Sequence, residues 1–228
     1  MNLEKTIIDG DLWYIDNFLT EEELAWLKPY MDDPKDWYVT MRSPYQNILN
    51  KFIGSIQRYD EDGNVLPPDA NTFGDPNVDI SIFSKPGGIW DRIRSVMPEH
   101  YDQHSSLQSF KYIPSEEIPS LLNEQFLKEY QAGYPLDYAM NWHVDQHEED
   151  NGMIASFSIY LNDDFEGGVL QFMEKPYVIE AKAGRFVNIP ITNEFRHRVS
   201  ILKSGNNRHT LYGNCWRTQT DVIHSEDC

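Results

Sequence analysis

Cysteine is scarce in this chain. Only Cys215 and Cys228 occur among the 228 residues, and the second is the final residue of the sequence. Two cysteines cannot form the disulfide framework that stabilises many small secreted domains. A domain of this length buries a sufficient core without such crosslinks. We therefore predict that the protein resides in a reducing compartment, the cytoplasm.

Long hydrophobic runs are also lacking. No stretch is apolar over the about 20 residues that a transmembrane helix requires. The first residues, Met1 to Thr6, lack the basic and apolar segments that mark a signal peptide. We expect neither membrane insertion nor secretion.

Positive charge is the third feature in short supply. The chain has 19 Lys and Arg residues against 37 Asp and Glu residues, so its formal net charge is -18. Such a surface repels phosphate backbones, and no cluster of basic residues offsets that repulsion locally. Nucleic acid and anionic membrane are therefore excluded as expected partners, which leaves a small-molecule or peptide substrate. The oligomeric state stays open.

Aromatic residues, by contrast, are abundant, with 13 Tyr, 11 Phe and 6 Trp. They favour half-buried strands. From about residue 107 the chain consists of short strand-like segments separated by turns rich in Gly, Asn, Asp and Pro, which predicts a β-sandwich or barrel. The predicted strands are Phe126–Tyr130, Tyr138–His143, Ile154–Leu161, Val169–Met173, Tyr177–Ala181, Phe186–Ile189, His197–Leu202 and His209–Trp216.

The N-terminal part has a helical pattern. A first strand, Leu12–Asp16, is followed by Thr20 and Glu23, whose spacing is that of a capping box at the start of a helix. A second helix is predicted over Ile89–Met97, and the loop around Asn64–Asn77 between the helices is a candidate lid. We predict one domain over residues 1–228, with a helical part at about 17–105 and a strand-rich core at about 107–217.

Candidate metal ligands begin with His143 and Asp145. Residues i and i+2 of a strand point to the same face, so this imidazole and carboxylate project together. They supply two of the three ligands of a 2-His-1-carboxylate triad, which is typical of oxygen-activating iron(II). The third ligand must come from a distant segment. His197, which starts a predicted strand, is preferred over His209, because His209 directly follows the arginine discussed next.

Arg208 is the candidate anchor for an anionic co-substrate. A guanidinium grips a carboxylate with two parallel hydrogen bonds, and a buried arginine requires an anionic partner. A structural salt bridge with one of the many acidic residues is the alternative interpretation. Tyr160 can add its hydroxyl to the same carboxylate, or it is simply a core tyrosine.

Several spaced motifs together resemble the prolyl 4-hydroxylase-like members of the 2-oxoglutarate/Fe(II)-dependent oxygenase superfamily. The similarity spans roughly residues 12–217. The interval from His197 to Arg208 is longer than the family usually shows, through an extra Asn in the turn. The motifs are Ile15–Thr20, Tyr130–Tyr134, Trp142–Asp145, Ser158–Asp163, Gly167–Phe172, His197–Val199 and Gly205–Arg208.

The resemblance implies a mainly β fold with flanking N-terminal helices, namely a double-stranded β-helix (a cupin-like jelly roll). It implies a dioxygenase that uses Fe(II), 2-oxoglutarate and O2, with ascorbate as a candidate reductant, and that hydroxylates a C–H bond. Tyr130 would line the co-substrate pocket, while Tyr160 and Arg208 would bind the distal carboxylate. A peptidyl prolyl residue is the expected substrate; a free amino acid or other small metabolite, and a non-catalytic cupin-like binding module, are the alternatives.

Overall fold

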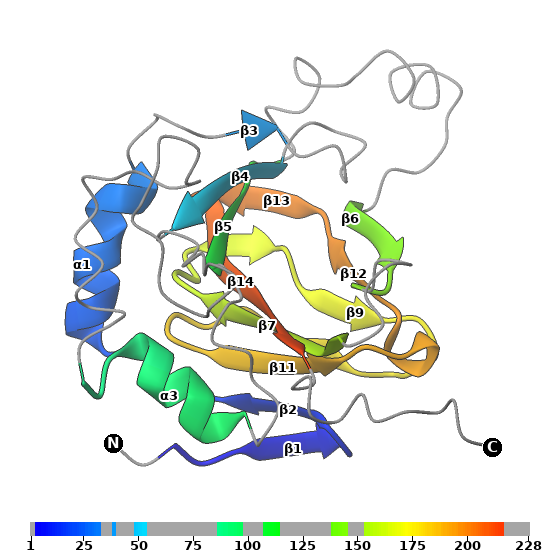
Figure 1. The fold of residues 1–228 in the computed structure, drawn as a ribbon. Coiled ribbons are helices and arrows are strands. Elements are labelled where there is room, and N and C mark those ends of the chain that lie inside the picture. The colour runs from blue at the N-terminus through cyan, green and yellow to red at the C-terminus, as the bar shows by residue number, and fades with distance from the viewer. Residues whose placement is uncertain are drawn as a thin grey trace, which may run out of the picture.

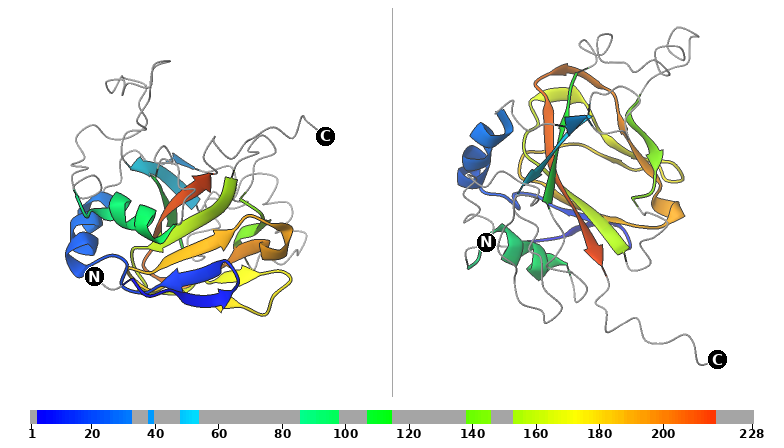
Figure 2. Two further views of the ribbon diagram at one scale, coloured as in Figure 1. Left: turned by 60° about the horizontal axis from the view of Figure 1, so that its bottom comes forward. Right: turned by 45° about the horizontal axis from the view of Figure 1, so that its top comes forward.

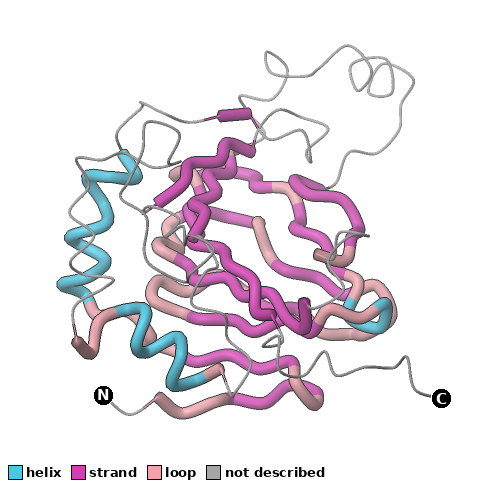
Figure 3. Tube along the Cα trace, viewed as in Figure 1, coloured by secondary structure: helices cyan, strands magenta, loops and turns pink. Residues whose placement is uncertain are grey.

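The protein consists mainly of antiparallel strands arranged in two facing sheets (Figure 1, Figure 3). The computed structural model describes residues 3–32, 38–39, 48–53, 86–97, 107–114, 138–145 and 153–216. The large sheet has eight strands in the order β1-β2-β11-β7-β14-β5-β4-β3. Their bounds are β1 (Thr6–Asp9), β2 (Leu12–Ile15), β3 (Tyr38–Val39), β4 (Ile48–Ile53), β5 (Leu107–Tyr112), β7 (Met153–Tyr160), β11 (Phe186–Pro190) and β14 (Arg208–Trp216).

The small sheet lies opposite the large sheet. It has four strands in the order β10-β9-β12-β6, and a separate two-stranded ribbon pairs β13 with β8. From β5 onward the chain passes back and forth between the large and the small sheet, with β8 and β13 in the separate ribbon, which is the winding of a double-stranded β-helix. The predicted fold class is therefore confirmed. The bounds are β6 (Tyr138–His143), β8 (Phe165–Gly167), β9 (Leu170–Phe172), β10 (Val178–Ile179), β12 (His197–Ser200) and β13 (Leu202–Gly205).

Two helices, α1 (Glu21–Asp32) and α3 (Ile89–Val96), lie together beside the strands (Figure 1, Figure 2). The predicted capping box starts α1: the Thr20 backbone N–H donates to Oε2 of Glu23 at 2.9 Å, and the Glu23 N–H donates to Oγ1 of Thr20 at 3.1 Å. Oε1 of Glu23 also accepts a hydrogen bond from Arg92 of α3 at 2.6 Å. The cap of one helix thus fixes the position of the other.

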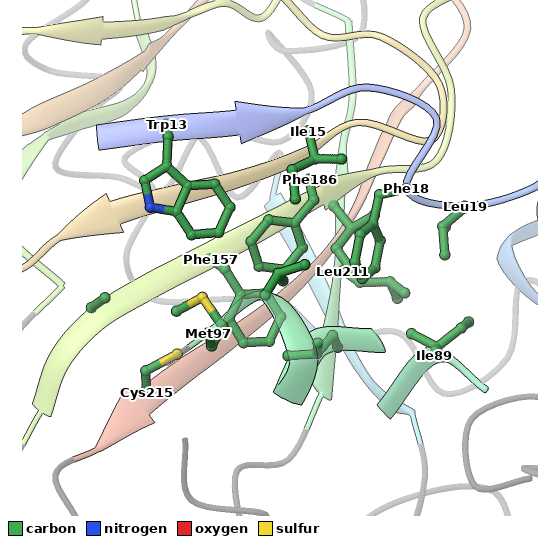
Figure 4. Packing of buried hydrophobic residues seen from close by; sticks show 14 of the residues in the cluster. Trp13, Ile15, Phe18, Leu19, Ile89, Met97, Phe157, Phe186, Leu211 and Cys215 are labelled. Atoms are coloured by element: carbon green, nitrogen blue, oxygen red, sulfur yellow. The ribbon is translucent and has the colours of Figure 1, made fainter. Parts of the chain in front are cut away.

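One hydrophobic core fills the space between these helices and the large sheet (Figure 4). Phe186 lies at its centre, with ring centroids 5.6 Å from Trp13, 4.8 Å from Phe18 and 5.1 Å from Phe157. The thiol of Cys215 is buried in the same cluster. Burial of these large apolar side chains stabilises the outer face of the large sheet.

The inner face of the large sheet meets the small sheet. Strand β7 shows the division most clearly, because Phe157 and Ile159 point into the helix-covered core while Ser158 and Tyr160 line a pocket between the sheets. Apolar residues of the small sheet, including Leu170 and Phe172, close the base of this space. Because side chains alternate along a strand, one set packs in the hydrophobic core and the other set lines the pocket.

Some elements differ from the sequence prediction. Segment 197–202 divides into β12 and the start of β13, and β1, β3, β4, β5 and β8 were not predicted. These strands are short or lack regular alternation, so the sequence gives little signal for them. The predicted strand Phe126–Tyr130 and the candidate lid Asn64–Asn77 lie outside the described residues. Among the helices described, none has the length and apolarity needed to cross a bilayer.

Candidate active site

Two strands of the small sheet bring the predicted ligands together. Strand β6 ends at His143 and β12 begins at His197, and these two residues are direct partners in the antiparallel register. Asp145 follows β6 by two residues, so its side chain projects on the same side as His143. Residues more than 50 positions apart in the chain thus meet through strand pairing.

The three side chains form a tight cluster. One ligand atom from each of His143, Asp145 and His197 lies within 4.8 Å of the others. Nε2 of His143 is 3.2 Å from Oδ1 of Asp145, and Nε2 of His197 is 3.5 Å from Oδ2. Among the described residues no other group of His, Cys, Asp and Glu side chains has this geometry. Two imidazoles and one carboxylate at such distances are a suitable donor set for a divalent transition metal.

Backbone carbonyls orient both imidazoles. Nδ1–H of His143 donates to the carbonyl oxygen of Asn141 at 2.6 Å, and Nδ1–H of His197 donates to that of Phe195 at 3.1 Å. Because a carbonyl only accepts, the proton of each neutral ring is held on Nδ1. Both Nε2 atoms therefore keep their lone pairs for a metal, as metal-binding histidines require.

The protonation states suit metal binding as well. Burial alone raises the pKa of Asp145. The positive charges that His197 and His143 carry when protonated, together with hydrogen bonds from protonated His143 and from Ser156, outweigh burial and hold this pKa well below its usual range. Burial lowers the pKa of His197, although the Asp145 carboxylate opposes that effect. At neutral pH the cluster offers a charged carboxylate and a neutral imidazole.

His209, the competing candidate ligand, lies on the other side of β14. Its neighbours Arg208 and Thr210 line the pocket between the sheets, whereas His209 alternates away from it. Its backbone N–H donates to Oδ1 of Asn162 at 2.8 Å, and burial with the nearby charge of Lys111 lowers its pKa to about 4. The structure does not bring His209 to the cluster.

Arg208 points into the same pocket as the cluster. Its side chain is 2% exposed, and within the described part of the chain its Nε and Nη1 atoms have no hydrogen-bond partner. The hydroxyl of Tyr160, which is fully buried, also has no partner there. A buried guanidinium with two unsatisfied nitrogen atoms and a buried hydroxyl without a hydrogen-bond partner are costly. Together they form a site that an anionic group would satisfy.

Aromatic rings hold the guanidinium in place. Its Cζ atom lies 4.3 Å from the ring centroid of Tyr112 and 5.0 Å from that of Tyr160. Tyr112 stands opposite Arg208 in the pairing of β5 with β14, and burial raises the pKa of its hydroxyl. On the other side, a Cβ at Gly168 would come within 2.9 Å of Cδ of Arg208, so a glycine there leaves room for the arginine.

Sequence reasoning missed Tyr112 because it did not predict β5. The only signal was the alternation of Phe110 and Tyr112 at the end of the segment, which is too short to identify a strand by itself. Tyr130, the third residue predicted to bind the co-substrate, lies outside the described residues.

Comparison with known families agrees with this geometry. The family model described as "2OG-Fe(II) oxygenase superfamily" matches residues 129–216, a segment that contains all three clustered side chains and Arg208. Over this segment the chain is similar to the 2OG-Fe(II) oxygenase superfamily. The similarity is to enzymes that use Fe(II), 2-oxoglutarate and O2, which supports the activity and cofactors predicted from the sequence. No curated protein sequence matches the chain.

Solved structures of prolyl hydroxylases show the same fold at low sequence identity. A prolyl-4-hydroxylase from Pseudomonas putida is 15% identical with a TM-score of 0.53, over 91% of this chain and 93% of that one. The viral collagen prolyl hydroxylase of Paramecium bursaria Chlorella virus-1, in complex with 2OG, is 14% identical with a TM-score of 0.51, over 92% and 97%. A Trichoplax adhaerens prolyl hydroxylase, in complex with a hypoxia-inducible factor peptide, is 12% identical with a TM-score of 0.52, over 95% and 88%.

Proposed function

We propose that this protein is a 2OG-Fe(II) oxygenase that hydroxylates a C–H bond of a peptidyl prolyl residue. In this proposal His143, Asp145 and His197 bind Fe(II), while Arg208 and Tyr160 bind the distal carboxylate of 2-oxoglutarate. The observation that carries the proposal is that a buried guanidinium, with two nitrogen atoms unsatisfied among the described residues, lines the same pocket as a 2-His-1-carboxylate cluster.

The three ligands suit iron(II) by number and by kind. Two neutral imidazoles and one carboxylate occupy one face of a metal and leave its other positions open. Those open positions are what a chelating keto acid and O2 need. The Nδ1 hydrogen bonds of His143 and His197 to backbone carbonyls support the assignment, because they fix each ring with Nε2 toward the shared centre.

The second part of the pocket suits a dicarboxylate. The guanidinium of Arg208 and the hydroxyl of Tyr160 are hydrogen-bond donors, so they favour a carboxylate over a neutral group. Tyr112 packs against the guanidinium and restricts its movement. These residues hold one end of the co-substrate, so that its keto acid end faces the cluster.

The chemistry divides between the bound groups and the chain. Iron and 2-oxoglutarate, when bound, supply the oxygen activation and the oxidative decarboxylation to succinate and CO2. The chain's residues bind and orient these groups. Apolar side chains of the pocket, such as Met140 and Val199, keep water away from the reacting centre.

The prolyl substrate is supported by the activities named for the similar structures. One acts on collagen and another is bound to a peptide of hypoxia-inducible factor. A free amino acid or a small metabolite is the alternative substrate for the same site. We further propose that residues 1–228 form a single oxygenase domain and that the protein is cytoplasmic, which the buried free thiol of Cys215 supports.

A succinate-release assay tests the proposal. Wild-type protein with Fe(II), 2-oxoglutarate and O2 is offered proline-containing peptides and, separately, free amino acids. We expect release with a peptide and none from Asp145→Ala, which lacks the charged ligand. Release only with a free amino acid would replace the proposed substrate. Failure of wild-type protein to bind Fe(II) and 2-oxoglutarate anaerobically would overturn the site itself.

A further inference from the structure

Ser156 contacts the carboxylate of Asp145 from the middle of the large sheet. It lies in β7, between the flanking strands β11 and β14, opposite Ile189 and Asn214. Its side chain is fully buried. The next residue, Phe157, points to the helix-covered core, so Ser156 points to the pocket side, as Ser158 does.

The contact between the two side chains is short and specific. Oγ–H of Ser156 donates to Oδ2 of Asp145 at 2.5 Å. The carboxylate is itself nearly fully buried, with 7% exposure. Hydrogen bonds from a hydroxyl to an ionised carboxylate are shorter and about twice as strong as neutral ones. In this setting the hydroxyl determines how the carboxylate is turned.

The two oxygens of Asp145 therefore have different environments. Oδ2 accepts the Ser156 hydrogen bond and lies 3.5 Å from Nε2 of His197, whereas Oδ1 lies 3.2 Å from Nε2 of His143 and takes no hydrogen bond from Ser156. An oxygen that accepts a strong hydrogen bond is a weaker donor to a metal. We propose that Ser156 is a positioning residue that occupies Oδ2 and leaves Oδ1 as the single oxygen that Asp145 offers to the metal.

Binding through one oxygen has a chemical consequence. A carboxylate that chelates with both oxygens takes an additional coordination position, and the keto acid and O2 need the remaining ones. Ser156 thus preserves the open positions on the metal, although it does not touch the metal. This inference depends on the proposed role of Asp145 as a ligand.

The chain offers a matched control for this serine. Ser109, in β5 of the same sheet, is equally buried, but its hydroxyl contacts the sulfur of Met31 on the helix side. Ser109→Ala removes the same atom at the same burial, away from the cluster. Ser156→Ala removes the hydrogen bond to Asp145, and Ser156→Thr retains the hydroxyl with a residue that suits a strand.

The experiment measures metal binding rather than turnover. Metal-free wild-type protein and the three variants are titrated anaerobically with Co(II) by calorimetry, and the visible spectrum of each complex is recorded. Thermal unfolding of the metal-free forms checks the fold. We expect Ser156→Ala to weaken binding by about 10- to 100-fold, as loss of a ligand's hydrogen-bond partner usually does. Its Co(II) spectrum should change, because the coordination of the carboxylate changes.

The other two variants serve as controls for Ser156→Ala. Ser109→Ala and Ser156→Thr should bind Co(II) with wild-type affinity and give the wild-type spectrum. The inference is overturned if folded Ser156→Ala matches wild type in both affinity and spectrum, or if Ser109→Ala loses as much affinity. Absence of Co(II) binding by wild-type protein would instead refute Asp145 as a ligand, which is a separate failure of the proposed function.

Discussion

Replacing Arg208 with methionine should change stability and co-substrate binding in opposite directions. The guanidinium is 2% exposed, and two of its nitrogen atoms have no partner in the described part of the chain. Exchanging a buried ion for a hydrophobic side chain of similar length is often neutral, or stabilising by about 1–4 kcal/mol. Metal-free Arg208→Met should therefore unfold at the same temperature as wild type or at a higher one.

Binding of 2-oxoglutarate should fall sharply in the same variant. Removing one partner of a buried charge pair costs about 2–5 kcal/mol, and about 1.4 kcal/mol corresponds to a factor of ten. The dissociation constant of 2-oxoglutarate should thus rise by at least about 30-fold. Arg208→Lys keeps the charge but not the planar donor geometry, so its affinity should lie between those of wild type and Arg208→Met.

Thermal unfolding with and without ligand measures both effects. Each protein is loaded anaerobically with Mn(II) and unfolded with increasing 2-oxoglutarate. A ligand at 100 times its dissociation constant stabilises the folded state by about 2.7 kcal/mol, so wild type should gain several degrees. At that concentration Arg208→Met should gain at most about 0.9 kcal/mol, a third of the wild-type effect. Equal shifts in the two proteins, or a large loss of stability in metal-free Arg208→Met, would refute the reasoning.

Two further predictions concern the metal ligands and the acid stability. His197→Ala should abolish Mn(II) binding in a calorimetric titration, whereas His209→Ala should retain it, since His209 alternates away from the cluster; loss in both variants would contradict the geometry. Hydrogen bonds from Arg185 lower the pKa of Asp16 below its ordinary value of 3.8. The ionised Asp16 carboxylate therefore stabilises the fold above about pH 4, and this stabilisation is lost as the pH falls through the pKa of Asp16 in the folded protein. Urea unfolding of Asp16→Asn should therefore show a deficit relative to wild type at pH 7 that shrinks at about pH 3, and an unchanged deficit would argue against the ion pair.

Local patterns were enough to predict much of the fold. The capping box of Thr20 and Glu23 identified the start of α1, and strand β6 was predicted with its observed bounds. These features depend on neighbours within a few residues. Strand β5, in contrast, is a strand because it pairs with β14 and β4. Such long-range pairing cannot be predicted from the pattern of a short segment.

Local sequence patterns likewise predicted only part of the candidate site. The spacing of His143 and Asp145 indicated two ligands, because residues i and i+2 of a strand share a face. The contributions of Tyr112 and Ser156 arise from contacts across strands, to Arg208 and to Asp145 respectively. No motif in the sequence marks these two residues, since tyrosine and serine are common in strands of every kind.

The direct pairing of His143 with His197 has a consequence for folding. A slip of β12 by one residue against β6 would turn the second imidazole to the outer surface of the small sheet. A metal ion held by this cluster would therefore bind more tightly to one alignment of these strands and stabilise it over its shifted alternatives. Iron availability during synthesis would then influence how much of the chain reaches the correct strand alignment, in addition to how much of it is active.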